Sequence, residues 1–348
     1  MKNNKRELLK SILMIVLSVM VIASVVIRLP YYIEVPGSAE NVRDFVSVDG
    51  QRNNEEGSYM LTTVGIRQGT LVSLIAAKFL PFQEIVSKQD LMGESTDEEF
   101  DEISKFQMTS SENMAKKVAL DLAKEPYEFQ YKGVYVLNVL SQSKFAKELK
   151  MGDIVYQVDE QQFKNSQEFM DYVSSKKAGE ELTIKFRRDG VEKSATGALI
   201  ELEGQKRAGI GITLVDHSEL ETQREVNIKT EDIGGPSAGL MFTLELYDLL
   251  ASKDSRRGRE IAGTGTINED GTVGSIGGID KKIVAADRAG ATIFFAPAEE
   301  YSEEIMKDNP DLLTNYQEAV IAAKEIKTKM KVVPVKTVHD ALDYLEKN

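Results

Sequence analysis

The chain has no cysteine and only two histidines among its 348 residues. The missing thiols exclude disulfides, thiol nucleophiles and thiolate metal sites, and they suit a cell-surface location where a free thiol would oxidise. His217 lies in a polar stretch and His339 in a C-terminal helical pattern, and neither has the setting of a catalytic-triad member. A serine nucleophile in this chain would therefore need a different base.

The sequence also lacks an excess of basic residues and a phosphate-binding loop. The net charge of −13 argues against nucleic-acid binding, because a phosphate backbone requires a basic face. No Gly-Lys dipeptide occurs anywhere, so the Walker loop that binds ATP is missing. The acidic cluster at 94–102 has no metal-ligand spacing and is interpreted as a solvated helix or loop. We therefore expect no metal or other cofactor, no nucleic acid and no ATP.

The amino end predicts a membrane anchor. Four cations precede an uncharged run at 11–27: Lys2, Lys5, Arg6 and Lys10. The run has the length of a short bilayer span, and the cations place the amino terminus in the cytoplasm. We expect a basic cytoplasmic tail at 1–10, a transmembrane helix at 11–29 and the remaining chain outside the cell membrane. A cleaved signal peptide and a buried core helix are the alternatives.

The residues around Ser237 predict a nucleophile at the start of a helix. An extended segment at 226–230 comes before the Gly-rich turn at 234–239, and an apolar series at helical spacing follows it. Free backbone N–H groups and the positive end of the helix dipole can hold an oxyanion beside a hydroxyl there. An ordinary serine N-cap is the alternative, and it is the favoured interpretation of an isolated Gly-Pro-Ser.

A second Gly-rich turn, at 274–278, opens a helix that carries Lys281 and Lys282. A lysine can take the proton of a serine if burial lowers the pKa of its amine towards neutrality. The two segments together resemble the proteolytic domain of the Lon family, a Ser–Lys dyad peptidase. The serine motif of that family reads Gly-Pro-Ser-Ala-Gly, as at 235–239, and its lysine motif reads Gly-Gly-hydrophobic-X-X-Lys, as at 277–282.

The Lon resemblance implies a role for each site residue. Ser237 would be the nucleophile, Lys282 rather than its neighbour Lys281 would be the base, and Thr264 would lie near the dyad and orient the lysine. The oxyanion and substrate site would comprise Gly235, Pro236 and Ala238. The family usually has Lys-Asp before Gly-Pro-Ser, where this chain has Ile233-Gly234.

Residues 131–197 predict strands, turns and a helix in an order that resembles a bacterial PDZ domain of the type attached to envelope proteases. The resemblance implies that the loop with Lys132, Gly133 and Val134 binds the C-terminal carboxylate of a peptide. The peptide would add as a strand beside 134–139 and face a helix at 165–176. A β-rich spacer without a ligand is the alternative.

The order of these segments predicts the architecture. The stretch at 108–115 resembles the first helix of the Lon domain, and it precedes the PDZ-like module, whereas Ser237 follows it. We expect an α+β fold in which a Lon-type proteolytic domain, at 34–130 and 198–348, carries an inserted PDZ-like β-rich domain at 131–197. Together with the N-terminal transmembrane helix, this order resembles the YlbL-type proteins of bacteria.

That resemblance implies an ATP-independent serine endopeptidase that cleaves extracytoplasmic or membrane-proximal proteins. Its partners would be protein or peptide substrates read by the PDZ domain, and the membrane through the N-terminal helix. A homo-oligomer is expected from the rings that Lon-like domains often form. The rival interpretation is a catalytically inactive Lon-like scaffold that recruits partners through its PDZ domain. The intact serine and lysine argue against it, whereas the absence of the family's Asp leaves room for it.

Overall fold

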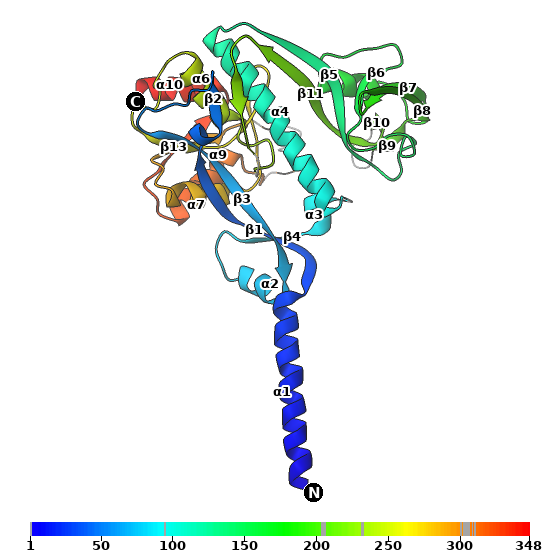
Figure 1. The fold of residues 1–348 in the computed structure, drawn as a ribbon, viewed down its shortest axis with the longest axis vertical. Helices are drawn as coiled ribbons and strands as arrows, with labels where there is room; N and C mark the ends of the chain where they lie inside the picture. Colours follow the sequence, from blue (N-terminus) through cyan, green and yellow to red (C-terminus); the bar gives the residue numbers. More distant parts are fainter. Residues whose placement is uncertain are drawn as a thin grey trace.

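Helix α1 (Lys2–Val26) stands apart from the folded body as a stalk (Figure 1). The structure, a computed structural model, describes residues 2–93, 95–202, 207–230, 233–299, 301, 307, 309 and 311–348, with side chains from Lys10 onward. Within these ranges, no helix is both long enough and apolar enough to cross a membrane. The transmembrane helix expected at 11–29 stays a prediction.

A six-stranded sheet forms the centre of the larger domain, in the order β17-β16-β13-β3-β1-β4. The strands are β1 (Arg28–Asn41), β3 (Ser58–Thr70), β4 (Glu84–Ser87), β13 (Glu260–Gly263), β16 (Ile293–Pro297) and β17 (Lys331–Val335). β1 and β3 form an antiparallel hairpin, whereas β13 pairs in parallel with both β3 and β16. The sheet therefore joins strands from both sides of the inserted domain, and the mixed α+β fold is confirmed.

Helices cover both faces of this sheet, because its strands carry apolar side chains on both sides. On one face, Tyr59, Leu61 and Phe295 pack against three helices: α4 (Asp97–Ala123), α6 (Gly239–Leu250) and α10 (Val338–Lys347). On the other face, Met60 and Phe294 pack against α7 (Ile279–Arg288) and α9 (Asn315–Glu325).

Helix α4 begins in the acidic cluster and runs between the two domains (Figure 1). Thr96 and Glu99 form a capping box, and the acidic first turn complements the helix dipole. Further along, Met108, Ala115 and Ala119 are buried and belong to the core that also contains α6 residues. The first helix expected from the Lon resemblance is thus part of the core that supports the Ser237 segment.

The inserted domain is a five-stranded sheet in the order β11-β5-β6-β7-β8, with a helix, α5, beside it. Its elements are β5 (Tyr127–Val139), β6 (Ile154–Val158), α5 (Ser166–Ser174), β7 (Glu181–Arg188), β8 (Val191–Ala198), β9 (Ile200–Leu202), β10 (Arg207–Gly209) and β11 (Ile212–Thr222). The predicted domain bounds at 131–197 stay a prediction, and the sheet of this domain also includes β11, which pairs with β5 from Ile212 to Thr222. The sequence pattern identifies a strand but not the distant strand with which it pairs.

Candidate active site and peptide groove

The loop that carries Ser237 is held from two sides. On one side, the N–H of Gly235 donates to the carbonyl of Ser104 (2.8 Å), and the Ser111 hydroxyl donates to the carbonyl of Pro236 (2.9 Å). On the other, the N–H of Gly265 donates to the carbonyl of Ser237 (2.9 Å). Helix α4 and the segment after β13 thus fix the backbone on both sides of the hydroxyl.

Two glycines of this segment are required by its geometry. Gly235 has a φ of +83°, a conformation that side-chain-bearing residues rarely adopt. Gly239 opens α6 so close to its neighbours that an added Cβ would lie 2.8 Å from a methyl of Ile267 and 2.9 Å from the Ser111 hydroxyl. The motif Gly-Pro-Ser-Ala-Gly therefore has a steric reason at both of its ends.

Lys282 lies in the first turn of α7, and its amine points at Ser237. The Nζ atom lies 2.7 Å from Ser237 Oγ, 3.0 Å from Thr264 Oγ1 and 2.9 Å from the carbonyl oxygen of Thr62. The side chain is 3% exposed, and this burial lowers the pKa of Lys282 to about 7. The structure thus brings together the three residues that the sequence singles out as Ser237, Lys282 and Thr264.

The hydrogen bonds around Lys282 fit a neutral amine. Such an amine has two N–H donors and one lone pair. The two donors match the Thr62 carbonyl and Thr264 Oγ1, which leaves the lone pair to accept the hydroxyl proton of Ser237. The Thr264 hydroxyl in turn donates to the Ser237 carbonyl (3.0 Å). Thr264, whose side chain is fully buried, therefore contacts both members of the pair.

Lys281 has the opposite electrostatic setting. Its amine lies 2.9 Å from Glu84, 3.3 Å from Asp280 and 3.5 Å from Glu34. Burial alone would disfavour the ammonium form, but these three carboxylates outweigh burial and hold the pKa of Lys281 above its ordinary value. The pKa values of two adjacent lysines are thus shifted in opposite directions, and Lys282 is the one that can accept a proton near neutral pH.

The predicted oxyanion residues divide in two. The N–H of Gly235 is used by Ser104, and Pro236 has no N–H, so neither can donate to an oxyanion. Towards the rest of the described chain, the N–H groups of Ser237 and Ala238 donate no hydrogen bond. Of the three predicted residues, only Ala238 therefore has an N–H that can donate to an oxyanion. The N–H of Ser237 is a second donor, which the sequence did not predict.

Three supporting residues were not found from the sequence: Thr62, Ser104 and Ser111. Thr62 lies on β3 and reaches Lys282 only because β13 pairs in parallel with β3. The two serines lie on α4, which precedes the inserted domain. Ser111 lies in the stretch at 108–115 that resembles the first helix of the Lon domain, but the sequence assigned neither serine a role, and their contacts join residues more than 100 positions apart.

The predicted peptide site at Lys132, Gly133 and Val134 is wrong. All three lie on β5, which is a central strand of its sheet. Val134 pairs with Asp216 of β11 on one side and with Val155 of β6 on the other, so β5 has no free edge there. A peptide cannot add beside it as a strand.

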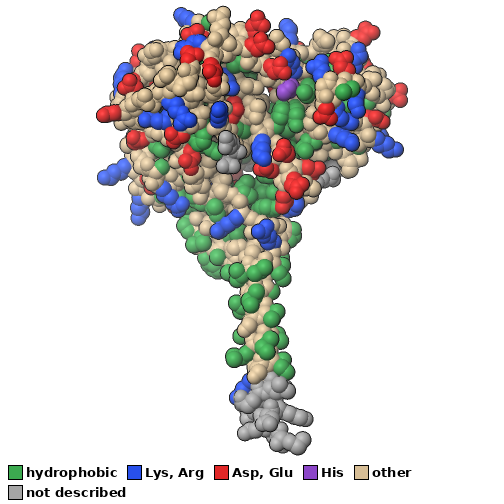
Figure 2. Space-filling view, viewed as in Figure 1, with side chains coloured by type: hydrophobic (Ala, Val, Ile, Leu, Met, Phe, Trp, Pro, Cys, Tyr) green, Lys and Arg blue, Asp and Glu red, His purple; other side chains and the backbone are tan. Residues whose placement is uncertain are grey.

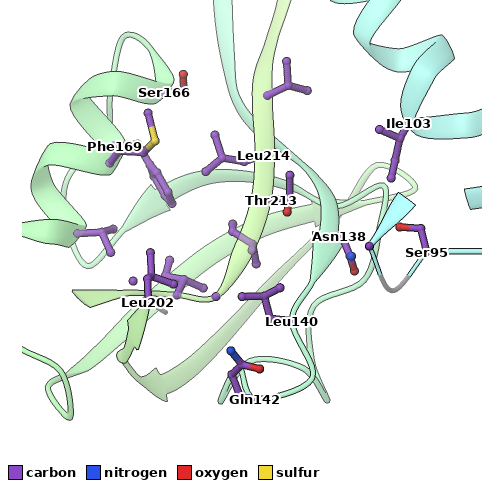
Figure 3. A pocket seen from close by; sticks show the side chains of 18 of the residues that line it. Ser95, Ile103, Asn138, Leu140, Gln142, Ser166, Phe169, Leu202, Thr213 and Leu214 are labelled. Atoms are coloured by element: carbon purple, nitrogen blue, oxygen red, sulfur yellow. The ribbon is translucent and has the colours of Figure 1, made fainter. Parts of the chain in front are cut away.

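β11 is an edge strand of this sheet, and it borders a groove of about 1010 Å³ (Figure 3). Helix α5 contributes Phe169 to one wall, and Thr213 and Leu214 of β11 lie beside it. The opposite side is formed by the other domain, with Ser95 and Ile103 at the start of α4. The predicted helix at 165–176 thus faces a groove, but the strand beside that groove is β11.

Within the described ranges, no group of three or more histidine and carboxylate side chains is arranged to hold a metal ion.

The comparisons with known proteins match the two domains separately. A PDZ-domain family model matches residues 105–199, and the model of the Lon protease (S16) C-terminal proteolytic domain matches residues 229–346. The Lon protease of Xanthomonas oryzae is 28% identical over 154 residues, which are 44% of this chain and 16% of that protein. The Lon protease of Heliobacterium modesticaldum is 33% identical over 113 residues, 32% of this chain and 13% of that protein.

Among solved structures, the PDZ domain of an SdrC-like protein from Listeria monocytogenes is 38% identical, with a TM-score of 0.24. The match covers 25% of this chain and 90% of that one. The matches to curated Lon proteases cover only 11–18% of the length of those proteins. One segment of the chain is thus similar to PDZ domains, and another is similar to the C-terminal proteolytic domain of Lon proteases.

Proposed function

We propose that this protein is an ATP-independent serine endopeptidase that uses Ser237 and Lys282 as a dyad. The observation that carries the proposal is the 2.7 Å contact between Ser237 Oγ and an amine whose burial lowers its pKa to about 7. A buried amine with a pKa near neutrality beside a hydroxyl is the arrangement that a lysine base requires.

The reaction follows from these contacts. Ser237 Oγ attacks the peptide carbonyl while Lys282 takes the hydroxyl proton, and the N–H groups of Ala238 and Ser237 hold the oxyanion. The Lys282 ammonium then returns the proton to the leaving amine as the C–N bond breaks, which leaves an ester on Ser237. In the second half, Lys282 takes a proton from water, the water oxygen attacks the ester, and Ser237 leaves with that proton.

Substrates are proposed to be unfolded or extended chains, because the sequence has no Walker loop to couple ATP hydrolysis to unfolding. The PDZ domain would select them by their carboxyl termini. A peptide can add as a strand beside the edge strand β11 and pack its side chains against Phe169 and Leu214.

The protein is further proposed to be anchored in the cell membrane by α1, with both domains on the extracytoplasmic side. The apolar side chains of α1 from Ile12 to Val26 contact little else, and most are about half exposed or more. Exposure of so much apolar surface to water is unfavourable, and insertion of α1 into a bilayer would remove that surface from the solvent.

The test is cleavage of a disordered protein by the purified full-length chain in detergent, without nucleotide. Wild type should cleave it, Ser237→Ala should not, and Ser194→Ala, at an exposed serine of β8, should match wild type. If wild type is inactive but binds C-terminal peptides, the scaffold interpretation takes the place of the peptidase.

A further inference from the structure

A group of exposed apolar side chains lies where α1 meets the folded body. The side chains of these residues are 44% to 82% exposed. We call the group the collar, and its members are Tyr31, Leu71, Val72, Ile75, Phe79 and Leu80. Five of the six come from the short helix α2 (Leu71–Ala77) and the turn after it. Figure 2 shows apolar side chains continuing from the stalk onto the adjoining end of the body.

Helix α2 is apolar on two faces, and only one face has a protein partner among the described residues. At about 100° per residue, Leu71 and Ile75 lie about 40° apart on the exposed side of the helix, and Phe79 follows in the turn after it. Ala77, about 160° from Ile75, is buried, and Leu74 packs against Gly69 at the end of β3. The inner face explains why the helix docks, but it leaves the outer face without a function in the fold.

The collar is fixed at the level where α1 ends. The chain leaves α1 and enters β1 at Arg28, which pairs with Thr70, the residue that caps α2. Contacts of α2 with both α1 and β1 hold it in this place. The outer face of α2 therefore continues the exposed apolar surface of α1, and the same environment would contact both.

We propose that the collar lies in the headgroup–acyl boundary of the lipid bilayer that α1 enters. The inference rests on the anchoring by α1 proposed above. The uncharged run at 11–27 extends about 25 Å as a helix, about 5 Å less than a typical hydrocarbon core. An interfacial helix buries its apolar face to a depth of about 5–10 Å, so the collar makes up the difference.

The polar residues of this region fit the same partner. Arg28, Arg67 and Lys78 are exposed around the collar and can contact lipid phosphates. Phe79 and Tyr31 are aromatic residues at the level where such side chains collect at membrane interfaces. A second copy of the chain would explain the apolar side chains, but not their continuity with α1 or the surrounding cations.

A second membrane contact would fix the orientation of the peptidase domain. Thr62, whose carbonyl holds Lys282, lies on the same strand as Thr70, eight residues earlier. Eight residues of extended strand span about 26 Å, so the carbonyl that contacts Lys282 lies about that distance along β3 from the residue that caps α2. The preferred substrates would then be extended segments that emerge from the membrane and are cut close to it.

The test uses single-cysteine variants of the full-length chain in phosphatidylcholine–phosphatidylglycerol nanodiscs, since the natural chain has no cysteine. Phe79→Cys reports on the collar, Leu17→Cys on α1, and Val191→Cys, at an exposed apolar residue of β8, is the matched control. Each carries the same fluorophore, and lipids with a nitroxide at an upper or a deep acyl carbon are the quenchers. Retained peptidase activity shows that the variants fold.

We expect the upper-carbon nitroxide to quench Phe79→Cys several-fold more than Val191→Cys, and the deep nitroxide to quench Leu17→Cys. Quenching at Leu17 with none at Phe79 would leave the anchor in place and overturn the collar. Quenching at neither position would overturn both. A blue-shifted but unquenched probe at Phe79 would assign the collar to another protein surface and so refute the lipid contact.

Discussion

The pH dependence of Ser237 acylation should report the pKa of Lys282. At the ordinary lysine pKa of 10.5, only about 0.03% of the amine would be neutral at pH 7. With the pKa lowered to about 7 by burial, about half of it is neutral, an increase of roughly a thousand-fold in the reactive form. Because the neutral amine is the base, the rate should rise with pH and level off above about pH 8.

The assay is the rate at which a peptidyl phosphonate labels the full-length protein between pH 5 and 10, with a midpoint expected near 7. Lys282→Arg keeps a positive charge that cannot be lost in this range, so it should label at the background rate. Lys281→Gln removes the neighbouring lysine, which does not contact Ser237, so the midpoint of labelling should stay the same. The free energy of unfolding should fall, because the three carboxylate partners of Lys281 lose their cation. A wild-type midpoint above pH 9, or a normal profile in Lys282→Arg, would refute the assignment.

Four further outcomes follow from the same contacts. Thr264→Val should lower the labelling rate about 10- to 100-fold and Thr264→Ser should restore most of it, because the hydroxyl bonds both members of the pair. Ser111→Ala removes the bond to the Pro236 carbonyl and should slow labelling several-fold with a loss of about 1 kcal/mol in the free energy of unfolding, measured by denaturant titration. Met170→Glu, in the groove wall, should weaken binding of an apolar C-terminal peptide at least ten-fold by fluorescence anisotropy while labelling of Ser237 stays unchanged. Between pH 7 and 9 the unfolded chain holds more protons on Lys282 than the folded chain, so stability relative to Lys282→Met should rise with pH, by at most about 2.7 kcal/mol; a flat difference would count against a lowered pKa.

The residues at the centre of the candidate site could be singled out from the sequence because short motifs carry them. Glycines that the turns require mark both loops, and the helical pattern after each loop places Ser237 and Lys282 at the starts of helices. Thr264 follows from the Lon resemblance. What the sequence could not supply is the packing of distant strands, so the Thr62 carbonyl and the two α4 serines were missed.

The same limitation explains the error in the PDZ domain. The segment at 133–139 reads correctly as a strand, but its neighbours decide whether it has a free edge, and β11 comes from beyond the predicted domain end. The sequence could not show which residues of the predicted oxyanion and substrate site can donate an N–H, since the N–H of Gly235 is bonded to α4 and Pro236 has none. Hydrogen-bond partners of that kind can be identified only in three dimensions.

The central claim is that Ser237 is a nucleophile activated by Lys282, and the most direct measurement locates the covalent adduct. The full-length protein is treated with the phosphonate at pH 8, digested, and mapped by mass spectrometry beside Lys282→Arg. We predict a single adduct on Ser237 in wild type and none in Lys282→Arg. An adduct on another residue, or equal modification of Ser237 in both proteins, would contradict the account.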